Sequence, residues 1–327
     1  MEKKERDNRT FIKNKKYLAY GALTLASVIF GFSFLFTKKT LEHLEIFQLL
    51  GIRFLAAALV MIILTAMRIV KIDLNRRKIT GILAISFIQP LLYFVFETFG
   101  IKLTSASESG MMIALIPITI AVFSMLILKE KIRAKQWIAI LAAAAGVVMI
   151  AAAKGSEPGG PHVLGYLILM GAIIAAGLYN PLSRKASAYC TPFEITFIMM
   201  LTGALFFNGI GLAIAGAEGR IGRYFADAMS FDVLSGILYL SLLSSIVAFF
   251  CLNYAYSKIK SSVSAGFANL TTVISVMAGV FLNNEKLYWL QLSGAVLVLL
   301  GIWGVAKYNR VEIEQKDCET FKGDMQG

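Results

Sequence analysis

Three ionisable residues, Arg53, Glu97 and Glu108, interrupt long apolar stretches of the sequence. The two glutamates fall in LLYFVFETFGIKLTSASESG, residues 91–110. A charged side chain in hydrocarbon costs at least about 2.5–3.5 kcal/mol on insertion scales. Each of these residues therefore needs either a partner that neutralises it or a function that uses its charge.

Two interpretations of these charges remain open from the sequence. Arg53 lies about 9 Å inside its apolar segment by helical rise, and Glu97 lies near the same end of the next segment, so a structural salt bridge is compatible with their depths. Glu108 would then be an interfacial carboxylate. In the functional alternative, one carboxylate binds a cationic group of a solute or a coupling proton.

A second set of candidates is uncharged and is spread over several apolar segments. Hydrogen-bonding groups on different helices suit a site for a zwitterionic or amphipathic solute at the middle of a membrane. The alternative for each is an ordinary interhelical hydrogen bond, worth about 0.6 kcal/mol. Aromatic rings on the same segments could shape the site or hold a cation. The predicted binding or gating residues of both kinds are Ser33, Phe34, Tyr93, Ser109, Tyr179, Asn180, Asn253, Asn269 and Thr272.

No arrangement typical of an enzyme occurs. The chain has no glycine-rich phosphate loop ending in lysine, and no paired-aspartate, His-Cys or zincin pattern. Its two histidines, His43 and His162, and its three cysteines, Cys190, Cys251 and Cys318, lack metal-ligand spacing. We therefore expect no catalysis, no cofactor and no metal.

The bulk composition places these residues in a membrane protein. The 327 residues are 57% hydrophobic and 16% charged, with a mean hydropathy of +0.71. Ten apolar segments are long enough, or nearly so, to cross a membrane. We predict that they are helices, because the period-2 alternation typical of an outer-membrane barrel is absent. Their limits are 17–37, 47–67, 79–99, 104–128, 134–153, 163–182, 193–215, 232–255, 262–282 and 287–306.

Charge placement predicts the topology. The net charge is +12, and 24 of the 32 lysines and arginines fall on one side of the predicted spans. The positive-inside rule puts that side, with both termini, in the cytoplasm. The basic surplus thus indicates orientation in a cytoplasmic or inner membrane, with the lipid bilayer rather than nucleic acid as partner.

The sequence repeats itself at long range. A shift of 155 residues superposes Ser107 on Ser262, Glu130-Lys131 on Glu285-Lys286 and Gln136 on Gln291, while a shift of 146 aligns earlier spans. Each half holds five spans, and an odd number inverts the second half relative to the first. Inverted repeats are typical of secondary transporters. The predicted segments are a basic tail 1–16, a first repeat 17–153, an external linker 154–162, a second repeat 163–306 and a polar tail 307–327.

Two pairs of motifs carry a family resemblance. The first pair is KLTSASESG and KIKSSVSAG. The second pair is KEKIRAKQW and NEKLYWLQL, each followed downstream by a glycine. In these motifs the chain resembles EamA-type members of the drug/metabolite transporter superfamily. The resemblance implies an all-α integral membrane protein with ten helices in two inverted five-helix repeats. It also implies an exporter of amino acids, related metabolites or drugs, with a central cavity lined mainly by spans 1, 3, 4, 6, 8 and 9.

We therefore predict a secondary transporter that exports a small molecule by alternating access. The alternatives are a non-transporting membrane protein, either a lipid-modifying enzyme or a scaffold, and a small-solute channel. Small residues in LAAAAGVV from Leu141 and in Gly301–Gly304 permit close helix approach. They fit helix packing or a homodimer contact.

Overall fold

The computed structural model describes residues 2–128, 134–152, 161–259, 261, 264, 267–301 and 303–304, and the regular elements in that part are helices. Three parts of the chain lie outside the described residues: the predicted C-terminal tail 307–327 with Cys318, residues 129–131, and most of the predicted linker 154–162. The α-helices are α1 (Glu2–Thr40), α2 (Ile46–Ala66), α3 (Arg76–Ser86), α4 (Tyr93–Leu103), α5 (Ala106–Ile113), α6 (Ile116–Leu128), α7 (Ala134–Ala152), α8 (Pro161–Ala186), α9 (Pro192–Ala217), α10 (Ile221–Tyr224), α11 (Phe231–Leu238), α12 (Phe249–Lys258) and α14 (Ala268–Asn283).

Seven helical stretches of the described residues are long and apolar enough to cross a membrane. They are Tyr17–Thr40, Ile46–Ala66, Arg76–Leu103, Ala106–Ile127, His162–Ala186, Pro192–Ala217 and Val233–Lys258. Three shorter apolar helices, Trp137–Ile150, Ala268–Asn283 and Trp289–Gly301, lie at the remaining predicted spans. The chain is thus an all-helical, multi-pass membrane protein, and the division into ten inverted spans stays a prediction.

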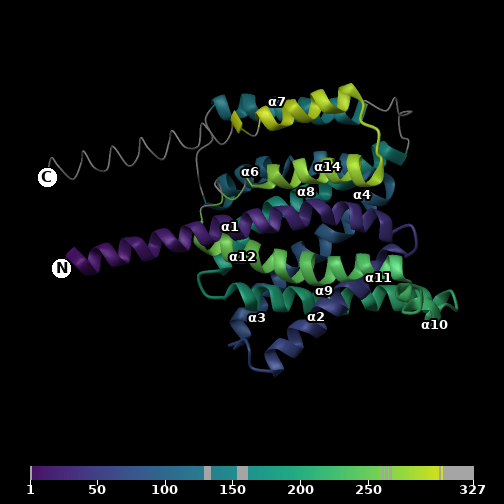
Figure 1. The fold of residues 1–327 in the computed structure, drawn as a ribbon, viewed down its shortest axis with the longest axis horizontal. Helices are drawn as coiled ribbons and strands as arrows, with labels where there is room; N and C mark the ends of the chain where they lie inside the picture. Colours follow the sequence, from purple (N-terminus) through teal and green to yellow (C-terminus); the bar gives the residue numbers. More distant parts are fainter. Residues whose placement is uncertain are drawn as a thin grey trace.

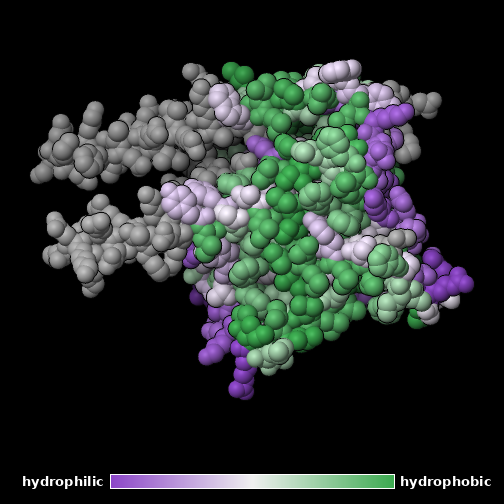
Figure 2. Space-filling view, in the orientation of Figure 1, coloured by the Kyte–Doolittle hydropathy of each residue, from purple (hydrophilic) through white to green (hydrophobic). Residues whose placement is uncertain are grey.

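The surface of the bundle is apolar between two hydrophilic ends (Figure 2). Large side chains on this surface point outward, with Leu205 77% and Trp289 86% exposed. Water would penalise such an area of exposed apolar surface, whereas lipid tails do not. The helices run side by side along one direction (Figure 1), so their polar ends coincide with the hydrophilic ends of the bundle.

Local sequence signals begin several of these helices. Ser105 and Glu108 form a capping box at the start of α5, and Thr191 and Glu194 form another at the start of α9. In such a box the side chains accept the backbone N–H groups that the first turn of a helix leaves free. The ends of α1 and α4 and the starts of α2 and α5 (Thr40, Leu103, Ile46 and Ala106) lie at the end of the bundle away from the N-terminus, which we call the far end (Figure 1).

Helix α1 joins elements from distant parts of the chain. It packs against α14 and α12 (Figure 1), while α2 packs on α9 and α4 on α8. The Ser27 hydroxyl donates to the Phe267 carbonyl oxygen over 2.9 Å. At Gly31 an added Cβ would lie only 2.6 Å from Ile274. The middle of α1 is thus fixed by residues more than two hundred positions later.

Two spans are interrupted near their middles, the first by a kink and the second by a wide π-helical stretch. Phe87–Leu92 separates α3 from α4, and Tyr239–Ala248 separates α11 from α12. The first contains Pro90, and its neighbour Gln89 has the non-helical dihedrals φ −143° and ψ 115°. Proline accounts for the first break, because it lacks a backbone donor. Such breaks occur frequently at functional sites.

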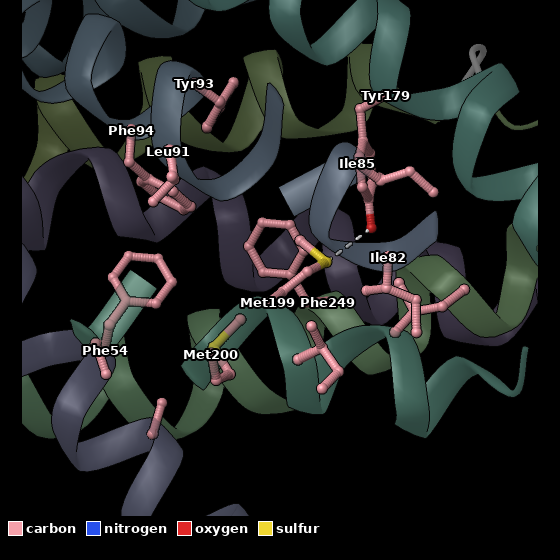
Figure 3. Packing of buried hydrophobic residues seen from close by; sticks show 14 of the residues in the cluster. Phe54, Ile82, Ile85, Leu91, Tyr93, Phe94, Tyr179, Met199, Met200 and Phe249 are labelled. Carbon is pink, nitrogen blue, oxygen red and sulfur yellow. Dashed lines mark hydrogen bonds between the residues drawn. The ribbon is translucent and has the colours of Figure 1, made fainter. Parts of the chain in front are cut away.

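Aromatic and sulfur-containing side chains fill the core beside these breaks (Figure 3). The Phe54 ring meets Phe94 edge-on at 5.1 Å between centroids and contacts Phe207 at 5.4 Å. Phe94 in turn lies 5.9 Å from Phe249. These contacts tie α2, α4, α9 and α12 together in the middle of the bundle.

Helix α7 and the helix Trp289–Gly301 approach so closely that only glycine fits. A Cβ on Gly146 would lie 2.5 Å from the carbonyl oxygen of Gly294. Because that oxygen belongs to the backbone, Gly146→Ala is expected to lower the free energy of unfolding by roughly 1–3 kcal/mol. Denaturant unfolding in detergent micelles would measure this.

Gly21→Ala is the matched control, because an added Cβ on Gly21 has nothing within 4 Å. Alanine is favoured over glycine in a helix by roughly 1 kcal/mol, so this variant should be as stable as the parent or more stable. Equal stability of the two variants would show that the close approach of the two helices is absent in the membrane protein.

Candidate functional site

A cavity with about 90 Å³ of water-accessible space lies in the middle of the bundle. This volume has room for several water molecules, since one needs roughly 10–15 Å³ on this measure. Its walls come from both halves of the chain: Leu23, Ala26, Ser27, Phe30, Ser33, Phe34, Gln89, Tyr93, Phe94, Glu97, Ile113, Ile116, Ile120, Ala176, Ser244, Phe249, Leu252, Tyr256, Ser264, Phe267, Ala268 and Thr271.

The cavity lies at half the depth of α1. Its lining on that helix runs from Leu23 to Phe34, which leaves six residues of the span Tyr17–Thr40 on either side. At about 1.5 Å per residue, roughly 9 Å of helix separates the cavity from each end of the span. Solute sites of secondary transporters lie at this depth.

Many lining residues come in pairs that are separated by the same sequence distance. Each of five is followed 155 positions later by another residue of the lining. The pairs are Gln89 with Ser244, Phe94 with Phe249, Glu97 with Leu252, Ile113 with Ala268, and Ile116 with Thr271. The 155-residue offset that superposes the two sequence repeats therefore also relates the lining residues that the first half gives to the cavity to those that the second half gives.

Glu97 carries the charge of this cavity. It is the one Asp, Glu, Lys or Arg among the described lining residues, and its side chain is 5% exposed. The Tyr93 hydroxyl donates to Glu97 Oε1 over 2.7 Å. No described residue donates to the other carboxylate oxygen, which is thus available to a bound group.

Gln89 and Ser244 are lining residues that the sequence analysis missed. Gln89 is 5% exposed, yet its amide makes no hydrogen bond with the described residues. Ser244 is fully buried. Gln89 lies at the kink of its span and Ser244 in the π-helical stretch of another, and the ordinary helical period does not predict the register of either. The one available signal was the 155-residue offset, which pairs them.

Arg53 lies behind the cavity wall rather than in it. Its Nε donates to Ser245 Oγ at 2.8 Å and its Nη2 to Ser244 Oγ at 2.9 Å. Its guanidinium carbon lies 4.4 Å from the centroid of the Phe94 ring. The predicted salt bridge with Glu97 is not formed, because within the described part of the chain neither residue has an opposite charge within 4.0 Å.

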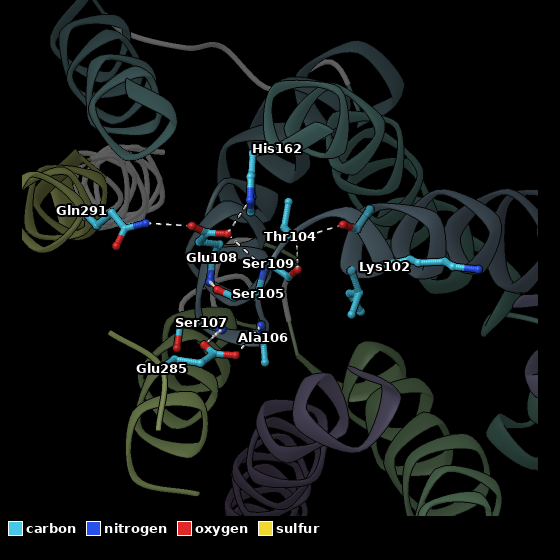
Figure 4. A network of polar contacts seen from close by, with 12 residues as sticks. Lys102, Thr104, Ser105, Ala106, Ser107, Glu108, Ser109, His162, Glu285 and Gln291 are labelled. Carbon is cyan, nitrogen blue, oxygen red and sulfur yellow. Dashed lines mark hydrogen bonds and ion pairs between the residues drawn. The ribbon is translucent and has the colours of Figure 1, made fainter. Parts of the chain in front are cut away.

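Glu108 and Ser109 lie outside the cavity, in a polar cluster at the far end (Figure 4). Glu108 accepts the Ser105 backbone N–H over 3.0 Å and the Gln291 amide over 2.9 Å. His162 Nδ1 lies 3.6 Å from Glu108 Oε2, the oxygen that accepts the Ser105 N–H. The Ser109 and Thr104 hydroxyls are 2.7 Å apart. Glu108 therefore holds α5 to a helix of the second half instead of facing the cavity.

A second carboxylate, that of Glu285, also joins α5 to the second half of the chain. Glu285 accepts the backbone N–H groups of Ala106 and Ser107 over 3.0 and 2.9 Å (Figure 4). These are the free N–H groups of the first turn of α5. The Asn283 amide also donates to Glu285. We call Glu285, with the α5 start at Ala106–Ser107, the far-end clasp.

Tyr179 and Asn253 belong to a buried network beside the cavity. The Tyr179 hydroxyl donates to Asn253 Oδ1 over 2.5 Å and also lies 3.2 Å from the Met199 sulfur (Figure 3). Ser183 donates to the same Asn253 oxygen, and Asn253 donates to Thr196 over 3.0 Å. The contacts of these two predicted residues are thus interhelical.

The remaining predicted residues divide between the cavity and its surroundings. Ser33 and Phe34 line it, although the Ser33 hydroxyl already donates to the Phe30 carbonyl. Asn180 reaches the lining indirectly, since its side-chain amide donates a hydrogen bond to Ser264 Oγ over 3.2 Å. Asn269 and Thr272 do not line it. Four predicted residues therefore lie in the cavity itself, namely Ser33, Phe34, Tyr93 and Glu97.

A second hollow, of about 460 Å³, lies at the far end between α2, α4 and α9. Four of the charged residues on its wall form two ion pairs, Lys102 with Glu45 at 3.2 Å and Arg220 with Glu218. Burial raises the pKa of the Tyr224 phenol on its wall to about 12, so this group stays neutral. Among the described charged residues on its wall, Asp227 alone makes no ion pair within 4.0 Å.

The model of the EamA-like transporter family matches the chain twice, over residues 18–152 and 163–307. The chain belongs to this family. An uncharacterized transporter of Bacillus subtilis (strain 168), YcxC, is 32% identical over 305 residues, covering 93% of this chain and 96% of its own. The probable amino-acid metabolite efflux pump of Escherichia coli (strain K12) is 25% identical, covering 85% and 91%.

The fold is also found among solved structures. One crystal structure matches with a TM-score of 0.60 at 19% identity, covering 89% of this chain and 98% of that one. Membership of the EamA-like transporter family implies membrane embedding and a small-molecule substrate, and the names of its relatives indicate transport rather than catalysis.

Proposed function

We propose that this EamA-like transporter exports a small metabolite that carries an amino group, an amino acid or a related compound, by alternating access. In this proposal ten spans form two inverted five-helix repeats, with both termini in the cytoplasm and the far end outside. The orientation is supported by the excess of lysine and arginine at the predicted cytoplasmic loops.

One observation carries the proposal: among the described lining residues, Glu97 is the single Asp, Glu, Lys or Arg of a mid-depth cavity that both halves of the chain line. A carboxylate among aromatic rings suits an ammonium group, which it binds by charge while the rings attract the cation. The relative named as an amino-acid metabolite efflux pump supports the same substrate class.

Coupling to protons follows from the same residue. Glu97 can hold either a proton or an ammonium ion, but not both. A proton that enters from outside would displace the exported solute, and loss of that proton to the cytoplasm would restore the site. Exchange of this kind drives export without ATP, for which the chain has no phosphate-binding loop.

The direct test compares metabolites in the medium and the cytosol of cells with and without the protein. Export predicts that at least one amine-bearing metabolite accumulates in the medium only when the protein is present. In reconstituted vesicles its flux should saturate and show counterflow. Linear flux without counterflow would instead identify a channel, and no difference in any metabolite would contradict export.

A further inference from the structure

We propose that Ser244, backed by Arg53, binds an anionic group of the solute, so that the exported molecule is a zwitterion with its ammonium on Glu97. This inference rests on the proposed function and narrows its substrate class. It assigns the two charged ends of the solute to residues on different spans, α4 and the π-helical turn Tyr239–Ala248.

Ser244 lines the cavity. Its oxygen accepts from Arg53 Nη2 at 2.9 Å, which engages one lone pair and leaves the hydroxyl proton to donate elsewhere. Its own proton finds no acceptor among the described residues, although the side chain is fully buried. A buried donor without an acceptor costs free energy until a ligand accepts from it.

Arg53 makes that donor stronger. A guanidinium stays charged in proteins, and this one contacts two serines and the Phe94 and Phe54 rings. A hydroxyl that accepts from a cation donates more strongly itself, because bonds in a chain polarise one another. Arg53 thus presents its charge to the cavity through Ser244 while Phe94 separates it from the solute.

The charge balance of the site selects a zwitterion. Glu97 lines the cavity, and Arg53 lies behind the cavity wall, where it donates to the hydroxyl of Ser244. A solute with only an ammonium group brings no negative charge for Arg53, and a solute with only a carboxylate is repelled by Glu97. Burying a charge without a partner is unfavourable, so the neutral sum of both groups fits best. The free amide of Gln89, 155 positions before Ser244, is a further donor on the same cavity.

Ser244 has a matched control in its neighbour. Ser245 is equally buried and accepts from Arg53 at 2.8 Å, but it does not line the cavity. Ser244→Ala and Ser245→Ala each remove one hydrogen bond from Arg53, so their effects on folding should be alike. A difference between them in transport therefore reports contact with the solute.

The experiment uses the full-length protein in vesicles and three matched probe families: alanine, leucine and phenylalanine, each beside the amine and the carboxylic acid with the same side chain. Wild-type protein should exchange at least one amino acid in preference to its amine and acid. Ser244→Ala should weaken exchange of that amino acid about tenfold or more, the worth of a hydrogen bond to a charged group. Residual amine exchange should stay unchanged, Ser245→Ala should leave both intact, and Ser244→Thr should restore the amino acid.

Two results would overturn the inference while leaving the proposed export of amines intact. One is a wild-type protein that exchanges an amine as well as its amino acid. The other is an equal loss in Ser244→Ala and Ser245→Ala. If the wild type exchanges no probe in any family, and metabolite profiles also show no difference, the proposed function itself fails.

Discussion

Exchanging Glu97 for glutamine is expected to abolish the response of export to a pH gradient and to weaken binding of the amine-bearing solute. In the wild type, acidifying the outside should accelerate export, since a proton from that side releases the solute from the carboxylate. Glutamine neither binds a proton there nor pairs with an ammonium. Because the ammonium group loses its charged partner, binding of the solute should become about tenfold weaker or more.

Flux from reconstituted vesicles at several external pH values measures both effects. Tyr93→Phe is the control, because it removes the hydrogen bond to Glu97 at 2.7 Å but keeps the carboxylate. That variant should retain a pH-dependent flux. Identical pH profiles of the wild type and Glu97→Gln would show that Glu97 has only a structural role.

Removing the far-end clasp is expected to open the cavity toward the side that we assign as external. Glu285→Ala deletes the acceptor of the Ala106 and Ser107 N–H groups, and each bond to a charged group is worth about 1.5–3 kcal/mol. Because these bonds exist only when α5 meets the segment after α14, their loss should shift the population toward the open state about tenfold or more.

Cysteine labelling detects that shift. With the three native cysteines replaced, Ser33→Cys places a thiol in the cavity lining, and a membrane-impermeant reagent added outside should label it faster in Glu285→Ala. Glu218→Gln alters an exposed carboxylate at the same end, paired with Arg220, and should not change the rate. Equal labelling of Glu285→Ala and the parent would exclude the clasp as a closing contact.

The sequence was sufficient to predict most helices and the existence of one mid-depth cavity. Hydropathy located the seven membrane-length helices and the three shorter apolar ones. Pro90 lies in the break of its span, and Pro117 is the second residue of α6. These features are local, so neighbouring residues determine them.

Partners across the bundle were harder to predict. Arg53 and Glu97 have compatible depths, but depth does not specify the direction in which a side chain leaves its helix. Arg53 points to Ser244 and Ser245, while Glu97 points to Tyr93. A π-helical turn adds a residue to its span and rotates all that follow. Polar residues beyond such a turn therefore face directions that the regular period does not give.

The packing of α1 against α14 has a consequence for synthesis. The ribosome must add more than two hundred residues after Thr40 before Ala268 begins α14. At about 5–20 residues per second, the first span waits roughly ten to forty-five seconds for this neighbour. During that interval the Ser27 hydroxyl has not yet met the Phe267 carbonyl. The earliest helix to enter the bilayer is thus among the last to reach its final neighbours.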